Sequence, residues 1–171
     1  DISERIKAEL ALRKSEDKTQ SIIRVAPVGI GLVADRIILE VNDYLCNLIG
    51  YTRNELIGKS SQIMYPSKEE FDRVGKIKYE QISTYGTGTV ETIFKCKDGR
   101  LVNVILSSTP LDKNDHSKGV TFTVLDITER KKAEEKLMES EARFRALVEN
   151  APDALFVFDL NLGKFVSISK S

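Results

Sequence analysis

The sequence predicts an α+β domain in which short helices cover one face of an antiparallel sheet. Two β-patterned runs, residues 29–33 and 37–41, precede several short helical segments, and three further β-patterned runs lie between residues 87 and 125. Strands that gather at the two ends of a domain, with helices between them, are typical of this class. At 171 residues the chain can hold one such domain and its linkers.

A repeat frames this domain. The opening DISER, residues 1–5, returns as DITER at 126–130, an offset of 125 residues, and twelve of the 33 paired positions in 1–33 and 126–158 are identical. A repeat this long indicates tandem globular domains joined by helices. We expect the end of a preceding unit with its linker helix at 1–21, a complete domain at 22–130, a linker helix at 131–147, and a truncated second domain at 148–171, with strands near 155–158 and 164–168.

The first helix and the first two strands have clear limits. Residues 4–24 form a charged helical run with apolar positions such as Ile6 and Ile22. Pro27 and Gly29 end it, because proline removes a backbone donor and glycine relaxes the backbone. The strands at 29–33 and 37–41 follow, joined around residues 35–36.

Capping residues mark the next helices. Asn42 or Asp43 can cap a helix that ends at Gly50. Residues 52–55 and 67–70 both have capping-box spacing, in which a hydroxyl and a carboxylate satisfy free amides at a helix start. The second box predicts a longer helix, to about residue 85.

The remaining strands carry apolar residues on both faces. Asp98-Gly99 predicts a hairpin between the strands at 87–97 and 101–108, and 120–125 forms the last strand after a polar loop. The helix-covered face should carry Val90, Phe94, Val102, Val104, Leu106, Val120, Phe122 and Val124. Ile93, Leu101, Ile105 and Leu125 point the other way. We therefore expect a cover on that outer face, either the Ile22-Ile23 end of the first helix or a second copy of the chain.

Composition narrows the possible functions. Lys+Arg and Asp+Glu both total 26, so the formal charge is zero and we expect no nucleic-acid partner. No apolar run approaches the roughly 20 residues that cross a bilayer, so we expect no membrane contact in this segment. Cys46 and Cys96 stand alone, which favours small buried roles in a reduced, cytoplasmic setting. The sequence lacks a nucleophile–base pair, a metal-ligand cluster and a nucleotide fingerprint, so we expect no catalysis here.

Several motifs resemble those of PAS sensory domains with their C-terminal PAC portion. Residues 41–45 (VNDYL) and 50–59 (GYTRNELIGK) are similar to the family's VN…GY…EL.G segment, 97–99 (KDG) to its hairpin, and 126–130 to its closing DITER motif. The resemblance covers residues 22–130. It implies a five-stranded antiparallel sheet of order 2-1-5-4-3 that holds a pocket against the short helices. It also implies a multidomain signalling parent, such as a sensor histidine kinase, with neighbouring PAS and output domains.

The resemblance also bears on cofactors. Haem-binding relatives ligate iron through a histidine on the long helix, but His116, the one histidine, falls in the polar loop, where we expect a solvated side chain. Light-sensing flavin relatives need a cysteine in an NCRFLQ segment before that helix, and here residues 60–66 read SSQIMYP. We expect neither haem nor a cysteine–flavin adduct, and the sequence leaves the ligand unknown.

A small-molecule ligand, if one binds, should meet the residues between the sheet and the short helices. These are Asn42, Tyr44, Leu48, Met64, Phe71, Phe94, Val104 and Phe122. Two alternatives stay open. Asn42 either only caps its helix or also binds the ligand, and the aromatic residues either line a cavity or form plain core.

The candidate signal junction comprises Asp126, Thr128 and Arg130, where the last strand becomes a helix. We expect Thr128 to cap that helix and an Asp126–Arg130 ion pair to couple the strand to its exit angle, against the alternative of an ordinary capped start. Leu137 and Phe144 lie seven apart, as in a weak coiled coil. We expect a relay in a homodimer that pairs through linker helices and the outer sheet face, or else a ligand-free dimerisation scaffold.

Overall fold

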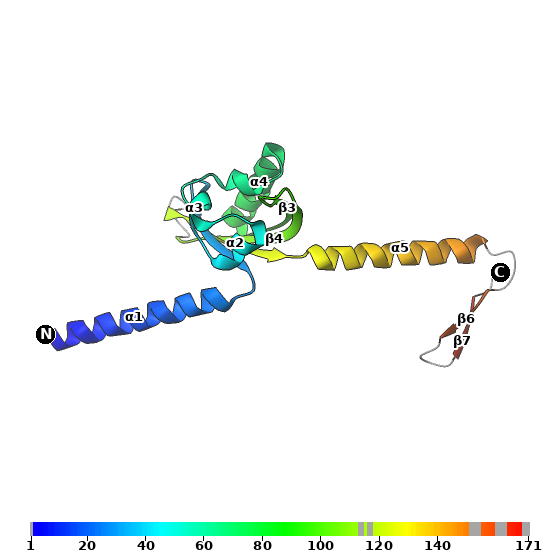
Figure 1. Ribbon diagram of the computed structural model, residues 1–171, viewed down its shortest axis with the longest axis horizontal. Helices are drawn as coiled ribbons and strands as arrows, with labels where there is room; N and C mark the ends of the chain where they lie inside the picture. Colours follow the sequence, from blue (N-terminus) through cyan, green and yellow to red (C-terminus); the bar gives the residue numbers. More distant parts are fainter. Residues whose placement is uncertain (1, 113–114, 116–117, 151–154, 160–163, 169–171) are drawn as a thin grey trace. The chain divides into compact units, whose positions relative to one another are not determined.

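The computed structural model describes residues 2–112, 115, 118–150, 155–159 and 164–168. The chain divides into two compact units, Asp1–Thr128 and Glu129–Ser171. The first unit holds the predicted sheet and its helices (Figure 1). His116, expected to be solvated, lies outside the described residues.

The sheet of the first unit has five antiparallel strands in the order β2-β1-β5-β4-β3, as the family resemblance implied. The strands are β1 (Gly29–Ala34), β2 (Ile37–Val41), β3 (Gly88–Lys95), β4 (Leu101–Pro110) and β5 (Val120–Asp126). The first and last strands pair at the centre, where Gly31 lies opposite Phe122. Segments distant in sequence therefore meet in the middle of the sheet.

The helices of the first unit are α1 (Ile2–Val25), α2 (Asp43–Ile49), α3 (Arg53–Leu56), the 3-10 helix η1 (Ser61–Met64) and α4 (Lys68–Tyr85). Helix α4 packs on β3 and β4, and α2 packs on β1 (Figure 1). The prediction of short helices between the second and third strands is confirmed.

The predicted caps occur, with one difference. The Asn42 side chain accepts a hydrogen bond from the Leu45 amide, and Gly50 ends α2 in the left-handed conformation. Ser67 accepts from the Glu70 amide at the start of α4. The reciprocal half of that second capping box is wrong, because the Glu70 carboxylate turns instead to Arg73 and to Thr92 on β3.

Burial alternates along the strands as the sequence pattern predicts. Strand β3 alternates buried and exposed residues throughout, and the predicted inner-face residues of β3, β4 and β5 are buried. On the outer face, Ile93, Leu101 and Leu125 are each more than a third exposed. Ile22, one candidate cover for that face, is itself exposed.

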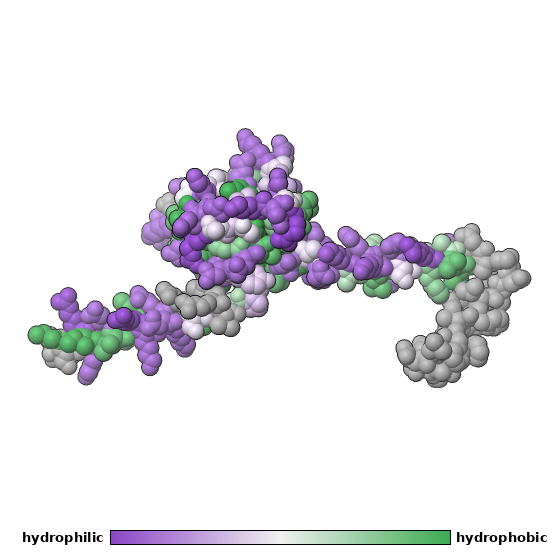
Figure 2. Space-filling model, viewed as in Figure 1, coloured by the Kyte–Doolittle hydropathy of each residue, from purple (hydrophilic) through white to green (hydrophobic). Residues whose placement is uncertain are grey.

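The second unit contains most of α5 (Thr128–Asn150) and a two-stranded antiparallel sheet, β6 (Leu155–Asp159) and β7 (Lys164–Ile168). Both strands lie where the sequence predicts them, and they pair with each other. Hydrophilic residues cover most of the visible surface of α5 (Figure 2). Among the described helices of both units, none has the length and apolar character that a bilayer crossing requires.

Candidate functional site

The structure places most of the predicted pocket residues inside the core. Met64, Phe71, Phe94, Val104 and Phe122 are buried members of one contiguous cluster, and Leu48 packs against it. Tyr44 is half-buried. The sequence therefore brings these side chains to the expected face, where they contact one another and their neighbours.

Close contacts fill the inner face beside β1. A Cβ atom placed on Gly31 would lie 2.4 Å from Cζ of Phe122, so only glycine lets that ring lie against the strand. The Tyr65 ring meets Phe71 and Phe94 edge-to-face, with centroids 5.3 and 5.1 Å apart. Such edge-to-face pairs stabilise a packed aromatic core.

Asn42 is a cap that also ties β1 and the residue before it to α2. Its Oδ1 accepts from the amides of Leu45 and Ile30, and its Nδ2 donates to the carbonyl of Val28. The predicted capping role is confirmed. The amide group thereby fixes the start of α2 against β1, and ligand binding by Asn42 stays a prediction.

A groove of about 440 Å³ lies over outward-facing positions of β1 and β5. Its lining is Ile30, Gly31, Leu32, Glu40, Val41, Asn42, Asp43, Arg53, Leu111 and Thr121. Arg53 and Asp43 form an ion pair of 2.8 Å on its margin. Of the predicted pocket residues, only Asn42 is in this lining. The alternation of Ile30 and Leu32 with small inward residues is the sequence signal that indicates this groove.

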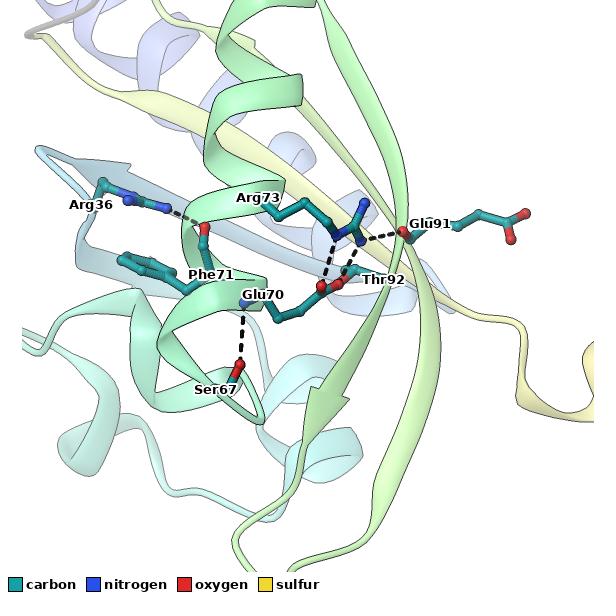
Figure 3. Close-up of polar contacts among 7 residues, drawn as sticks. All are labelled: Arg36, Ser67, Glu70, Phe71, Arg73, Glu91 and Thr92. Carbon is teal, nitrogen blue, oxygen red and sulfur yellow. Dashed lines mark hydrogen bonds and ion pairs between the residues drawn. The ribbon is translucent and has the colours of Figure 1, made fainter.

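Glu70 joins α4 to the edge strand β3 (Figure 3). Its carboxylate accepts from Arg73 Nε at 2.7 Å and from the Thr92 hydroxyl at 2.5 Å. Arg73 also donates to the carbonyl of Glu91. The Arg73 guanidinium is the main reason that the pKa of Glu70 is lowered. We call Glu70, Arg73 and Thr92 the Glu70 clamp. Its centre is the ionised Glu70 carboxylate, which accepts hydrogen bonds from Arg73 on the helix and from Thr92 on the sheet.

Arg36 reaches from the β1–β2 turn to the same helix. Asp35 and Arg36 both adopt positive φ, 48° and 65°, which turns the chain tightly between the strands. The Arg36 guanidinium lies over the Phe71 ring, 3.3 Å from its centroid, and Nη2 donates to the Phe71 carbonyl at 2.6 Å (Figure 3). No local pattern of residues indicates this contact, which spans 35 residues.

The junction between β5 and α5 is hydrogen-bonded to β4. Asp126 Oδ1 accepts from the Thr128 amide at 2.8 Å. The Asn103 backbone carbonyl accepts from the Ile127 amide at 2.9 Å, and the Asn103 backbone N–H donates to Thr128 Oγ1 at 3.0 Å. Asp126 therefore holds the first amide, Thr128 anchors the helix start to Asn103, and capping by Thr128 stays a prediction.

Arg130 lies one helical turn before its observed ion partner. Its Nε is 3.6 Å from the Glu134 carboxylate, on the exposed surface of α5. The Asp126–Arg130 ion pair stays a prediction. Asn103 was missed because it contacts the junction through backbone atoms, 25 residues away from Thr128, and such contacts leave no local signal in the sequence.

The two cysteines are free thiols, Cys46 half-buried and Cys96 buried. Burial raises the pKa of both, so both are protonated at neutral pH. Within the described ranges, the structure groups no three His, Cys, Asp or Glu side chains in a way that could hold a metal ion.

Comparison with known proteins places this geometry in a family. The PAS domain family matches residues 27–129, and a second PAS domain match covers residues 142–171. The chain is 30% identical to the sensor protein TdiS of Thauera aromatica over 127 residues, 74% of this chain and 23% of that protein. It is 28% identical to sporulation kinase E of Bacillus subtilis, over 93% of this chain and 21% of that protein. The chain thus spans less than a quarter of either relative.

A solved structure is similar in both sequence and fold. It is the PAS domain, in complex with ethanol, of a LuxR-family transcriptional regulator from Burkholderia thailandensis. That domain is 29% identical, with a TM-score of 0.59, and the match covers 63% of this chain and 96% of the domain. The sheet order, the short helices between β2 and β3, and the family match over residues 27–129 lead to one conclusion: the chain belongs to the PAS domain family.

Proposed function

We propose that this chain is a sensory and relay module of a multidomain signalling protein, specifically a sensor histidine kinase. Two relatives support this proposal by name, a sensor protein and a sporulation kinase. The chain matches less than a quarter of each, so a kinase activity would reside in other parts of the parent protein. The module itself would receive a small ligand or a signal from a neighbouring domain.

The observation that carries the relay proposal is the position of Asn103. Its backbone bonds Ile127 on one side and the Thr128 hydroxyl on the other, so β4, the end of β5 and the first residue of α5 share one set of hydrogen bonds. A shift of β4 relative to β5 would change the direction in which the helix leaves the sheet. A junction with two such arrangements can bias the pairing of helices in a dimer.

The Asp126→Ala variant tests the relay. We expect it to lower the free energy of unfolding by about 1 kcal/mol or less, because it removes one exposed hydrogen bond to a helix-start amide. We expect it to alter output, measured as autophosphorylation of the full-length parent across its stimulus range. Ser67→Ala is the control, since Ser67 also accepts one exposed hydrogen bond from a helix-start amide, that of Glu70, at the start of a different helix. Altered output from both variants, or from neither, would contradict the relay.

A second candidate function is a ligand-free scaffold that dimerises and spaces its neighbours. The packing of the predicted pocket residues into one core favours it. Native mass spectrometry and an absorption spectrum of the purified chain separate the two functions. A bound small molecule supports sensing, and an empty protein that dimerises supports the scaffold. Haem or flavin absorption bands would contradict the cofactor prediction.

A further inference from the structure

Lys78 is a buried cation on the inner side of α4. The residue is only 8% exposed, and it shares its helix face with the buried residues Val74 and Ile82. Among the described residues its ammonium has no hydrogen-bond or ion-pair partner; its nearest ring contact is Tyr79, with Nζ 5.5 Å from the ring centroid. A lysine at an apolar position of a packed helix is unusual, because burying an unpaired charge is costly.

Ser108 is a second unpaired polar group on the same face. Its hydroxyl is buried and has no hydrogen-bond partner within the described part of the chain. Ser108 pairs directly with Gly88 across β3 and β4, so its side chain lies on the face where a side chain at Gly88 would point. The stem of Lys78 occupies that space: a Cβ on Gly88 would lie 2.9 Å from Lys78 Cγ. Lys78 and Ser108 therefore share one patch of the inner face.

Arg36 adds a second cation at the border of this patch. A Cβ on Gly75 would lie 2.5 Å from Arg36 Nη2, so the guanidinium crosses α4 one turn before Lys78. Asp72 lies 3.4 Å from Arg36 and supplies one negative charge. The group of Arg36, Asp72 and Lys78 therefore keeps one net positive charge, which belongs to Lys78.

The charge persists at neutral pH. Burial, and to a smaller degree the Arg36 charge, lowers the pKa of Lys78 to about 8. At pH 7 the amine is therefore still mostly protonated. The fold keeps a largely buried, charged lysine and an unpaired hydroxyl on one patch of the inner face, and a bound anion would satisfy both groups.

We propose that Lys78 and Ser108, with Arg36 at the border, bind the carboxylate of a small organic monocarboxylic acid. One net positive charge matches one carboxylate, whereas phosphate carries more than one negative charge at neutral pH. The apolar residues Val74 and Ile82, one turn to either side of Lys78, would contact the hydrocarbon end of the acid. This assignment rests on the proposed sensory function and names its ligand class.

The test is a titration of the whole chain with sodium propionate, followed by amide resonances in NMR at constant ionic strength held with sodium chloride. We expect saturable shifts at Gly88 and Ser108. Lys78→Met should weaken propionate binding at least about tenfold, because it removes the charge and keeps the apolar stem. Lys76→Met is the matched control on the exposed face of α4 and should change the affinity by less than about twofold.

Each other outcome overturns the assignment. Equal propionate affinity in wild type and Lys78→Met would exclude Lys78 as the binding cation. Saturation of the same resonances by inorganic phosphate and not by propionate would replace the ligand class. If neither anion binds while native mass spectrometry finds an uncharged bound molecule, the carboxylate site is wrong and the sensory function stands. If no molecule of any kind binds, the scaffold function is favoured and both proposals fall.

Discussion

At the scale of single residues, Gly31 sets how closely β1 and the core can approach. A Cβ there would lie 2.4 Å from Cζ of Phe122 and 2.7 Å from the Glu40 carbonyl oxygen, both below any normal contact. The ring can move, but the backbone oxygen of the paired strand cannot move without disturbing the β1–β2 ladder. The centre of the sheet therefore depends on the absence of one methyl group.

Gly31→Ala should destabilise the domain by about 1–3 kcal/mol, the usual cost of overpacking a core. Urea unfolding followed by circular dichroism measures the change. The double variant Gly31→Ala/Phe122→Leu should lose less unfolding free energy than the sum of the losses in the two single variants. Leucine removes the ring atoms that the new methyl group meets, although the contact with Glu40 remains. Strictly additive effects of the two substitutions would show that the ring is not what the new methyl group meets.

Lys78 gives a pH dependence with a defined sign. Its folded pKa of about 8 lies below the value of 10.5 expected for an unfolded lysine. Between these values the unfolded chain binds more protons than the folded chain, so the contribution of Lys78 makes stability rise with pH across that window. Below about pH 8 both states are protonated, and the full cost of the buried charge remains.

Lys78→Met should therefore be more stable than wild type below about pH 8, by up to about 3 kcal/mol, and the difference should shrink as pH rises toward 10.5. Urea midpoints of both proteins from pH 7 to 10 measure it. The groups that face Lys78, Arg36 and Tyr79, are present in both proteins, so the comparison reports the change at residue 78. Parallel pH profiles would contradict the lowered pKa.

At the scale of elements, the Glu70 clamp decides how α4 lies on the sheet. The helix crosses the edge strand β3, where backbone groups would otherwise be open on one side. Glu70 bonds Thr92, and Arg73 bonds the Glu91 carbonyl, so both partners contact the same stretch of β3 (Figure 3). The helix thereby protects the edge of the sheet as well as its inner face.

Glu70→Gln should cost about 1–2 kcal/mol, because a neutral amide forms weaker hydrogen bonds with Arg73 and Thr92 than the carboxylate does. Thermal unfolding at neutral pH measures the loss. Glu69→Gln is the matched control, since it removes the same charge from the first turn of α4 without touching β3. The lowered pKa of Glu70 predicts that the difference between the variants fades as the pH falls below the usual range of a carboxylate. An equal loss in both variants would assign the effect to the helix dipole.

The sequence predicted the elements because their signals are local. Asn42 and Ser67 cap helices within four residues of themselves, and the alternation in β3 is visible in eight consecutive residues. Arg36, Asn103 and Lys78 act through partners or burial set by the tertiary fold. Lys78 lies four residues from both Val74 and Ile82, but this spacing alone does not show that a charged side chain is buried there, while Lys76 is exposed. The fold could therefore be predicted from the sequence, whereas the contacts that define a site could be found only in the structure.

At the scale of the whole molecule, apolar side chains remain uncovered on two surfaces. The outer sheet face of the first unit carries Ile93, Leu101 and Leu125. Helix α5 carries exposed Leu137, Met138, Phe144 and Leu147. Exposed apolar residues along a helix otherwise rich in charge are typical of a surface that pairs with another helix. Both surfaces fit the proposal of a homodimer.

Pairing through α5 should depend on Leu137 and Phe144, which lie seven residues apart on one side of the helix. We expect Leu137→Glu/Phe144→Glu to shift the chain from dimer to monomer, because four charges would then face each other across the seam. Sedimentation velocity over a concentration series measures the change. Ala142→Glu/Ala146→Glu adds the same charge at positions off this seam and should leave the dimer intact. If both variants dimerise as wild type does, the outer sheet face would be the interface, and Leu101→Glu on that face should then dissociate the dimer.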